Sequence, residues 1–322
     1  MKKLFPLTGK RVWVAGHSGM VGSALTRKLP EAGAEVLTLK RSECDLRDQP
    51  AVHAWVAENR PDAILIAAAT VGGIEANRTR PAEFLYDNLL IAANIIHAAA
   101  ESGVAKLVFL GSSCFYPREA AQPIREDSLL TGAFEPTNEW YAVAKVAGVK
   151  LCQAYRRQHG KDFIAAVPTN LYGPGDNFDL AGSHVVAAMI RRLHEARLNR
   201  QSPVDIWGTG RPRREFLYVD DAASALVYVL EHYSDEGIIN VAGGEDVSIA
   251  ELAELVAGVV GYTGGFRFDT SKPDGMPRKT LDDSRIRAAG WRPAVSLREG
   301  LEHTYASFLE DSGNRVPPAR HG

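Results

Sequence analysis

Short apolar runs alternate with stretches of helical periodicity along the first half of the chain, and this alternation constrains the fold more than any other feature. Predicted strands cover residues 11–15, 35–39, 63–69, 106–110 and 163–167. Predicted helices lie at residues 23–32, 51–59, 88–102 and 141–159. Strands and helices that alternate at this spacing form right-handed βαβ units. The sequence therefore predicts an α/β protein with a doubly wound parallel sheet of the Rossmann type.

The second half of the chain is less regular and is expected to add a smaller lobe. The pattern predicts a helix over 185–196, a strand entering a helix over 213–221, and a short strand at 238–241 that is a candidate to rejoin the main sheet. We expect the first domain to combine two segments of the chain and a C-terminal substrate-binding lobe to combine the remainder. The domains so predicted cover residues 1–172 plus about 214–244, and residues 173–213 plus 245–322.

Composition argues against several classes of function. The chain is 45% hydrophobic and 24% charged, as in an ordinary globular protein. Its 37 basic and 39 acidic residues give a net charge of -2, so we expect neither nucleic acid nor a membrane surface as a partner. The cysteines Cys44, Cys114 and Cys152 are too few and too scattered for a disulfide framework or a metal site. We therefore expect no metal and a cytoplasmic location.

A glycine-rich turn follows the first predicted strand. Gly16, Gly19 and Gly22 are spaced three residues apart where that strand gives way to a helix. In a dinucleotide-binding turn, such glycines permit tight turning and close approach of the backbone to a pyrophosphate, and the helix N-terminus attracts the phosphates. A plain glycine-rich loop would show the same spacing. The turn therefore indicates a dinucleotide only together with other features.

The end of the second predicted strand discriminates between cofactors. A carboxylate there accepts a hydrogen bond from the ribose 2′-hydroxyl of NAD, whereas a cation pairs with the 2′-phosphate of NADP. This strand ends in Lys40 and Arg41. The two cations favour NADP, and a solvated basic loop is the alternative.

Tyr141 and Lys145 lie four residues apart, on one face of a predicted helix. A phenol is a slow acid or base at neutral pH unless a nearby cation stabilises its phenolate, and Lys145 is one turn away. Ser112 follows the fourth predicted strand, at the edge where an open α/β sheet binds ligands. An isolated Tyr-x-x-x-Lys is usually a surface pair. Joined to the glycine turn and Ser112, it predicts hydride transfer between a nicotinamide and a carbonyl.

The pattern leaves the roles of Cys114 and His184 open. A cysteine near a strand end is more often a small buried hydrophobe, and a lone histidine is more often structural than catalytic. Both become functional only if the enzyme moves protons at carbon as well as hydride, because a thiolate and an imidazole are suitable acid/base groups near pH 7.

Several motifs resemble the extended short-chain dehydrogenase/reductases that act on nucleotide sugars, and most closely their 3,5-epimerase/4-reductase members. The stretches that carry the resemblance are residues 15–22, 71–74, 111–117, 135–139, 168–174, 176–178, 214–216 and 271–275, which span nearly the whole chain. The resemblance implies inversion of C3 and C5 of GDP-4-keto-6-deoxy-D-mannose, followed by reduction of the C4 ketone with NADPH to GDP-L-fucose. It also implies a homodimer, with residues 88–102 and 141–159 packing as a four-helix bundle.

The resemblance also assigns roles to individual residues. Ser112, Tyr141 and Lys145 would carry the reduction, while Cys114 and His184 become the base and the acid of the two epimerisations. Residues that match positions contacting the GDP-sugar are Arg192, Trp207, Arg214, Asp274 and Lys279. Residues expected to bind the cofactor are Gly16, His17, Ser18, Gly19, Met20, Val21, Gly22, Lys40, Arg41, Asp45, Leu46, Ala68, Leu110, Gly111, Ser113, Lys145, Pro168, Asn170, Leu171 and His184.

Three positions refine this expectation. Dehydratases of the family place an Asp-Glu pair directly after the strand-end hydroxyl residue, where this chain has Ser113 and Cys114, so dehydration is not expected. The family commonly has an arginine where this chain has Ser18, so the preference for NADP over NAD is expected to be weaker. One alternative is another nucleotide-sugar 4-epimerase or 4-reductase in which Cys114 is incidental. A second alternative is a non-catalytic NADP-sensing protein.

Overall fold

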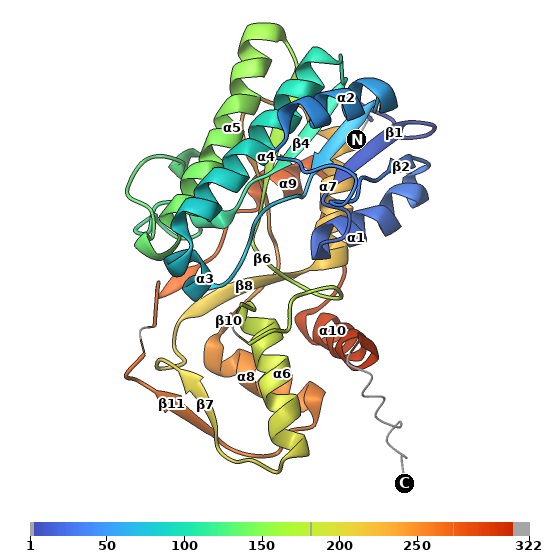
Figure 1. Ribbon diagram of the computed structural model, residues 1–322. Helices are drawn as coiled ribbons and strands as arrows, with labels where there is room; N and C mark the ends of the chain where they lie inside the picture. Colours follow the sequence, from blue (N-terminus) through green and yellow to red (C-terminus); the bar gives the residue numbers. More distant parts are fainter. Residues whose placement is uncertain (1–2, 181, 273, 312–322) are drawn as a thin grey trace.

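The chain folds into two lobes, which the computed structural model describes over residues 3–180, 182–272 and 274–311 (Figure 1). The larger lobe contains a parallel sheet covered by helices on both faces, and the smaller lobe contains short strands and helices of its own. The end of the predicted substrate lobe, at residues 312–322, lies outside the described residues. This architecture confirms the predicted doubly wound sheet of the Rossmann type with a smaller second lobe.

The sheet of the larger lobe has the strand order β2-β1-β3-β4-β5-β9, and every neighbouring pair is parallel. Its strands are β1 (Arg11–Ala15), β2 (Glu35–Leu37), β3 (Ala63–Ile66), β4 (Lys106–Leu110), β5 (Asp162–Pro168) and β9 (Ile239–Val241). The candidate strand at 238–241 does rejoin the sheet, beside β5. Because the strand order reverses between β1 and β3, a crevice is expected beyond their carboxyl ends.

Helices cover both faces of this sheet because its strands are apolar on both sides. In β1, Trp13 packs with the core under α2, α4 and α5, whereas Val12 and Val14 pack with the core under α1 and α7. The bounds of the covering helices are α1 (Met20–Lys28), α2 (Gln49–Asn59), α4 (Pro81–Glu101), α5 (Glu139–His159) and α7 (Val219–His232). Shorter helical segments are α3 (Ile74–Thr79), α9 (Ser284–Ala289), η1 (Leu29–Ala32), η2 (Ser113–Phe115), η3 (Glu126–Ser128) and η4 (Pro136–Asn138).

Several predicted boundaries differ from the observed ones. The predicted strands 35–39 and 63–69 end earlier, at Leu37 and Ile66. β3 ends level with β1, because Ile66 pairs with Ala15, the last residue of β1, whereas β2 leaves the sheet after Leu37 although β1 continues for two more residues. The predicted helix 23–32 starts earlier, at Met20, and becomes the 3₁₀ segment η1, which has a proline in its first turn. A proline at the first helical position, Pro81, likewise starts α4 before residue 88.

The smaller lobe is built around β8 (Arg213–Tyr218), which leads directly into α7 as predicted. Around β8 lie β10 (Glu245–Ser248), antiparallel to it, and the parallel strands β6 (Asn170–Tyr172) and β12 (Arg278–Lys279). A separate parallel pair consists of β7 (Val204–Trp207) and β11 (Phe266–Asp269). The helices α6 (Val185–Leu198), α8 (Ile249–Val260) and α10 (Leu297–Asp311) share one apolar core with these strands.

Buried polar contacts fix the smaller lobe against the larger one. The buried carboxylate of Glu215 on β8 accepts hydrogen bonds from the backbone of Gly243, 2.8 Å away, and of Leu281, 3.0 Å away. The side chain of Asn240 on β9 donates to the backbone oxygens of Ile124 and Asp282. The space between the lobes is therefore held by defined contacts. Within the described part of the chain, no helix combines the length and apolarity that a membrane crossing needs.

Candidate active site

A cavity of about 850 Å³ lies between the lobes, beyond the carboxyl ends of β1, β3, β4 and β5. It lies at the reversal of strand order, where an open α/β sheet binds its ligands. The cavity is lined by every site residue predicted from the sequence except Lys40, Arg192 and Trp207. Residues up to 263 positions apart therefore share one space, because Gly16 and Lys279 both line it.

The glycine turn has the conformation and the close contacts that a pyrophosphate site requires. Gly16 has a φ of 88°, and a Cβ there would lie 2.6 Å from the Cα of Ala68. A Cβ at Gly22 would lie 2.0 Å from the backbone oxygen of Gly16. Gly19 caps α1 without a side chain, so the first N–H groups of the helix face the cavity uncovered. The buried Nδ1 of His17 has no hydrogen-bond partner among the described residues. These features fit a bound diphosphate.

A cluster of charged side chains borders the turn. Arg47 donates hydrogen bonds to Asp45 at 2.6 Å and to Asp87 at 2.9 Å. The hydrogen bonds from Arg47 lower the pKa of Asp45 to about 2. Arg41 also lines the cavity, whereas Lys40 does not. Of the two cations predicted to select the cofactor, only Arg41 therefore borders the space that a cofactor would occupy.

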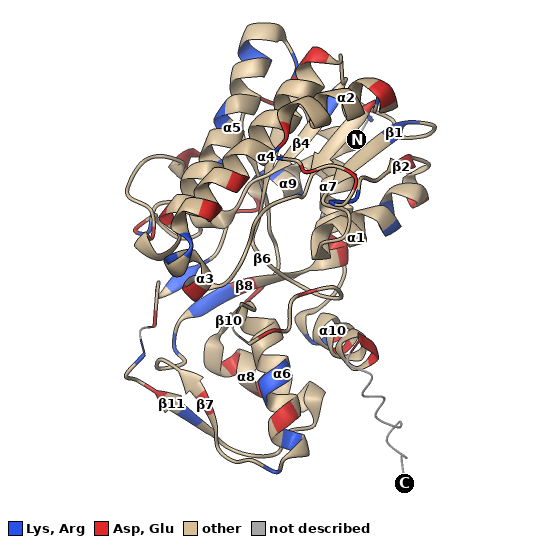
Figure 2. Cartoon of the chain, in the orientation of Figure 1, with Lys and Arg blue, Asp and Glu red and all other residues tan. Residues whose placement is uncertain are grey.

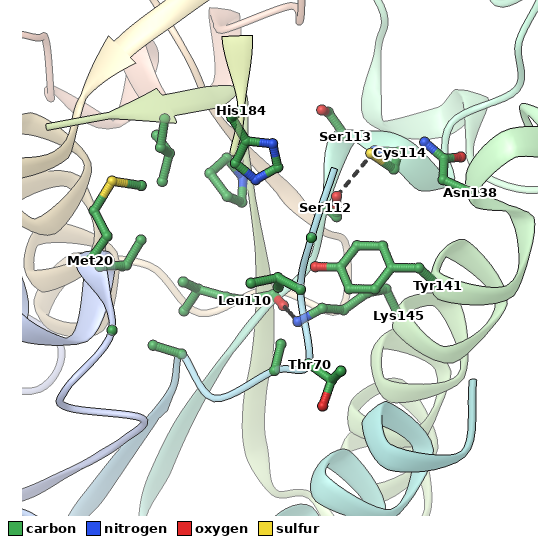
Figure 3. Close-up of a pocket in the computed structure, with 18 of the residues that line it drawn as sticks. Met20, Thr70, Leu110, Ser112, Ser113, Cys114, Asn138, Tyr141, Lys145 and His184 are labelled. Atoms are coloured by element: carbon green, nitrogen blue, oxygen red, sulfur yellow. Dashed lines mark hydrogen bonds between the residues drawn. The ribbon is translucent and has the colours of Figure 1, made fainter. Parts of the chain in front are cut away.

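Ser112, Tyr141 and Lys145 converge from β4 and α5 (Figure 3). The Tyr141 hydroxyl points into the cavity between the Ser112 and Lys145 side chains. The Ser112 Oγ accepts a hydrogen bond from the Cys114 backbone at 3.2 Å, which holds the serine at the end of β4. Lys145 Nζ donates to the backbone oxygen of Leu110 at 2.8 Å and lies 5.7 Å from the centre of the Tyr141 ring. A phenol, a hydroxyl and an ammonium therefore face one point.

Burial dominates the electrostatics of this set. Burial raises the pKa of Tyr141 well above its ordinary value, the charge on Cys114 raises it further, and the hydrogen bond with Ser112 opposes both. Burial also lowers the pKa of Lys145 to about 8. Burial, and not the charge of Lys145, therefore dominates the pKa of the Tyr141 phenol. Tyr141 is held neutral, which is the form that donates a proton.

Cys114 and His184 face the same cavity from two sides, with Ser112 between them (Figure 3). Cys114 lies in η2 and is partly exposed, whereas Cys44 and Cys152 are buried. The Nζ of Lys279 donates to the Cys114 Sγ at 3.7 Å. His184 caps α6, and its side chain faces the cavity. The interpretation as a small buried hydrophobe thus describes the other two cysteines and not Cys114.

The residues matched to GDP-sugar contacts divide into two groups. Arg214, Asp274 and Lys279 line the cavity. Both oxygens of Asp274 accept hydrogen bonds from Thr209, at 2.6 and 2.8 Å, so this carboxylate also fixes the neighbouring loop.

The second group lies outside the cavity lining, on the smaller lobe. Arg192 lies over the exposed ring of Trp207, 5.6 Å from its centre, and Lys272 lies over the same ring at 5.7 Å. Figure 2 shows further Lys and Arg residues at the start of β8 and on α6. Several of these cations are paired with carboxylates, because Arg191 pairs with Glu195 and Arg213 pairs with Asp246.

Several cavity residues have no role in the prediction from the sequence. Arg47 is held by two carboxylates, and Asn138 has a buried Oδ1 without a partner among the described residues. Outside the cavity lining, Asp176 has an Oδ2 that likewise lacks a partner among the described residues and lies near His184, and burial raises the pKa of Asp176. Asn138 and Asp176 lie in motifs that carry the family resemblance, which was the available signal. Arg47 directly follows Asp45 and Leu46, which were predicted to bind the cofactor, but no sequence motif pointed to Arg47 itself.

Comparisons with known proteins agree with this geometry. Residues 12–242 match the NAD dependent epimerase/dehydratase family. The GDP-L-fucose synthase of Sinorhizobium fredii is 54% identical over 308 residues, which cover 96% of this chain and 98% of the relative. The GDP-L-fucose synthase of Escherichia coli is 50% identical over 315 residues, which cover 95% of this chain and 98% of the relative.

Solved structures give the same result. The structure of a GDP-L-fucose synthetase from Naegleria fowleri bound to NADP superposes with a TM-score of 0.88 at 27% identity, covering 97% of this chain and 98% of that chain. From the sheet, the glycine turn, the Tyr-Lys pair and these matches, the chain belongs to the NAD dependent epimerase/dehydratase family.

Proposed function

We propose that this protein converts GDP-4-keto-6-deoxy-D-mannose to GDP-L-fucose by 3,5-epimerisation and NADPH-dependent reduction at C4. One observation carries the proposal: Cys114 and His184 share a single cavity with Ser112, Tyr141 and Lys145. A 4-reductase alone needs only the last three. Relatives that are 50–54% identical over nearly the full chain are named GDP-L-fucose synthases. The alternative of another nucleotide-sugar 4-epimerase or 4-reductase is therefore not favoured.

NADP(H) is the cofactor that the cavity and the relatives support. The backbone around Gly16, Gly19 and Gly22 would hold its pyrophosphate, and Arg41 would face its 2′-phosphate. The structural relative from Naegleria fowleri has NADP bound. When bound, the cofactor supplies the hydride for the reduction.

The epimerisations need one base and one acid on opposite faces of the sugar. The C4 ketone acidifies the C–H bonds at C3 and C5. The Cys114 thiolate takes the proton from one carbon, the electron pair moves to the C4 oxygen as an enolate, and protonated His184 returns a proton to the other face. Each inversion leaves a thiol and a neutral imidazole, and exchange with solvent restores the starting forms. The placement of the two side chains supports this division of roles (Figure 3).

The reduction at C4 would use Ser112, which follows β4, together with Tyr141 and Lys145 on α5. Ser112 would hold the C4 oxygen, and the Tyr141 O–H would donate a proton to that oxygen as the carbon is reduced. Burial supports this role because it keeps Tyr141 in the protonated form. Lys145 would hold the nicotinamide ribose beside the phenol.

The GDP portion of the substrate would extend from the cavity onto the smaller lobe. Arg214 and Lys279 would face the diphosphate, as cations that line the cavity. Arg192 and Trp207 lie beyond the lining and would contact the far end of the nucleotide. Asp274 completes the set that the family resemblance assigns to the GDP-sugar.

We also propose a cytoplasmic homodimer that pairs α4 and α5 with their copies in a four-helix bundle. The two helices pack along each other in one chain. Tyr86 on α4 is 62% exposed, and Trp140 and Val143 on α5 are 47% and 37% exposed. Apolar side chains on an outer helix face suit a second copy.

We also propose the division into two domains that the sequence predicted, residues 1–172 plus about 214–244 and residues 173–213 plus 245–322. Under this division β6 and most of β8 belong to the first domain, although the two strands pair with each other in the sheet of the smaller lobe.

One assay tests the activity. The enzyme is incubated with GDP-4-keto-6-deoxy-D-mannose and either NADPH or NADH, and both cofactor oxidation and product stereochemistry are followed. We expect one equivalent of NADPH to be consumed and a product inverted at C3 and C5. A reduced product with the original configuration would identify a simple 4-reductase. Turnover with retained cofactor and no net NADPH consumption would identify a 4-epimerase.

A further inference from the structure

The contact between Lys279 and Cys114 joins two residues that are 165 positions apart in the sequence. The Lys279 Nζ donates to the Cys114 Sγ at 3.7 Å. Cys114 belongs to η2 at the end of β4 in the larger lobe, and Lys279 belongs to β12 in the smaller lobe. The contact therefore bridges the cavity at the sulfur that the proposed epimerisation uses as its base.

The backbone at Lys279 and at the next two residues is held by the fold, which fixes the point where the lysine side chain begins. Lys279 pairs with Arg214 in the parallel register of β12 and β8. The next residue, Thr280, donates its backbone N–H to Gln122 at 2.9 Å. Leu281 then donates its backbone N–H to the buried carboxylate of Glu215 at 3.0 Å. These contacts fix the backbone from which the Lys279 side chain extends toward η2.

The chemistry at the sulfur gives this ammonium a purpose. A thiolate is the form that removes a proton from carbon, and an adjacent cation is the usual means by which proteins favour a thiolate. Three other cations of the cavity are differently engaged. Lys145 donates to the backbone of Leu110, and Arg214 donates to the backbone of Arg213 and Met276. Arg47 donates to Asp45 and Asp87. Lys279, by contrast, is directed at the Cys114 sulfur.

We propose that Lys279 is a positioning residue for the epimerisations, holding Cys114 as a thiolate and directing its lone pair into the cavity. This inference rests on the proposed function, because it gives Lys279 a role through the base of that reaction. It revises the assignment of Lys279 as a partner of the substrate diphosphate, which predicts an effect only on substrate binding.

Alkylation of the substrate-free enzyme tests the proposal directly. Cys114 is the partly exposed cysteine, and Cys44 and Cys152 are buried, so peptide mapping after iodoacetamide treatment reports on Cys114. For Lys279→Met we expect alkylation of Cys114 at pH 7 to slow by on the order of tenfold, the effect of losing one cation about 4 Å from a thiolate. Lys279→Arg should restore most of the rate. Alkylation of Lys279→Met at the wild-type rate would overturn the proposal.

Arg278→Met is the matched control. Arg278 is the preceding residue of the same short strand, but its guanidinium pairs with Asp246 and not with the sulfur. We expect alkylation of Cys114 to be unchanged in this variant. A comparable slowing would show that disturbance of β12 causes the effect, and this outcome would also overturn the proposal.

Deuterium exchange at C3 and C5 of the substrate separates this inference from the proposed function. In Lys279→Met the exchange rate at saturating substrate should fall, and its half-maximum should move to higher pH. A rise in KM alone, with an unchanged pH profile, would identify a diphosphate anchor and overturn the proposal. The proposed function fails separately, if Cys114→Ser exchanges these protons at the wild-type rate, because alkylation of Cys114 does not depend on its use as a base.

Discussion

At the scale of single residues, the cavity separates two kinds of proton transfer. Tyr141 is buried and held neutral, whereas Cys114 is partly exposed and lies beside an ammonium. A general acid needs its proton and a base must lose one, so the two environments suit opposite tasks. Cys114 also raises the pKa of Tyr141, so a charged sulfur helps to keep the phenol protonated.

Removing the phenol should affect only the reduction. Tyr141→Phe keeps the ring that packs against Phe84 but lacks the proton that the C4 oxygen receives. We expect hydride transfer to slow by on the order of 10²–10⁴-fold, the usual range for losing a general acid. Single-turnover oxidation of NADPH measures this step. Normal turnover would refute the role of Tyr141, and deuterium exchange at C3 and C5 should continue.

Removing the thiol should have the opposite effect. Cys114→Ser keeps the size of the side chain but replaces the thiolate with a much weaker base. We expect epimerisation to be abolished while an already epimerised ketone is still reduced. Both activities can be followed in one preparation, by product stereochemistry and by NADPH oxidation. Unchanged epimerisation would contradict the assignment.

Lys145 should leave a signature in the pH dependence of stability. Burial lowers its pKa from 10.5 to about 8, so between these values the unfolded chain binds more protons than the folded one. The free energy of unfolding therefore rises with pH across this window. The contribution of Lys145 to this rise is on the order of 3 kcal/mol in total. Below pH 8 the lysine is charged in both states and its contribution is constant.

Urea unfolding of the wild type and of Lys145→Met at pH 7.5 and pH 9.5 measures this contribution. The free energy of unfolding of the wild type, minus that of the variant, should be larger at pH 9.5. The comparison cancels all other titrating groups. A difference that is equal at both pH values would mean that Lys145 titrates normally in the folded protein.

At the scale of elements, local pattern located the sheet well and the smaller lobe poorly. Residues 11–15 and 106–110 are strands with the predicted bounds, because central parallel strands are continuous apolar runs. Within residues 35–39 and 63–69 the strands are shorter than predicted, because the point where a strand leaves the sheet depends on the surrounding fold and is not a local property. The helices α8 and α10 and the strands β7 and β10–β12 fall where the pattern loosens, and they were not predicted individually.

The candidate site shows the same limit. The pattern alone predicted Ser112, Tyr141 and Lys145, and all of them line the cavity. The family resemblance added Cys114 and His184, which also line the cavity. It did not indicate that Lys279 contacts Cys114, because that contact depends on how β12 pairs with β8. It also did not distinguish Arg41 from Lys40, because which side chain borders a cavity depends on how the loop turns after β2.

The turn into α1 offers a test in which two glycines should behave differently. A Cβ at Gly22 would lie 2.0 Å from the Gly16 backbone oxygen, whereas a Cβ at Gly19 would meet its nearest atom at 3.6 Å. Gly22→Ala should therefore lower the free energy of unfolding by about 1–3 kcal/mol, the usual cost of overpacking. Gly19→Ala should leave the free energy of unfolding nearly unchanged and weaken NADPH binding, because its methyl group would occupy the approach of the pyrophosphate.

Chemical denaturation and fluorescence titration with NADPH measure the two effects separately. If Gly19→Ala bound NADPH like the wild type, the pyrophosphate would not approach the turn at this residue. If Gly22→Ala were as stable as the wild type, the backbone around Gly16 would be able to shift and relieve the close contact.

At the scale of the whole molecule, one sheet and one cavity depend on segments from both ends of the chain. β9 completes the main sheet only after the chain has built β7 and β8, and Glu215 then ties β8 to the backbone of Gly243 and Leu281. The proposed substrate contacts of the smaller lobe are therefore positioned by the larger one. α5, which carries both Tyr141 and Lys145, also contributes to the outer face assigned to the dimer.

That face supplies the last prediction. Tyr86 and Val143 lie on α4 and α5 and are 62% and 37% exposed, so a carboxylate at either position is tolerated in a monomer but buried in the proposed four-helix bundle. Burial of an unpaired charge at an interface costs several kcal/mol, and each interface would contain two copies. We expect the double variant Tyr86→Glu, Val143→Glu to sediment as a folded monomer while the wild type sediments as a dimer. Leu198→Glu, at a 57% exposed position on α6, is the control and should remain dimeric. A dimeric double variant would place the interface elsewhere, and a dissociated control would attribute the change to added charge rather than to this helix face.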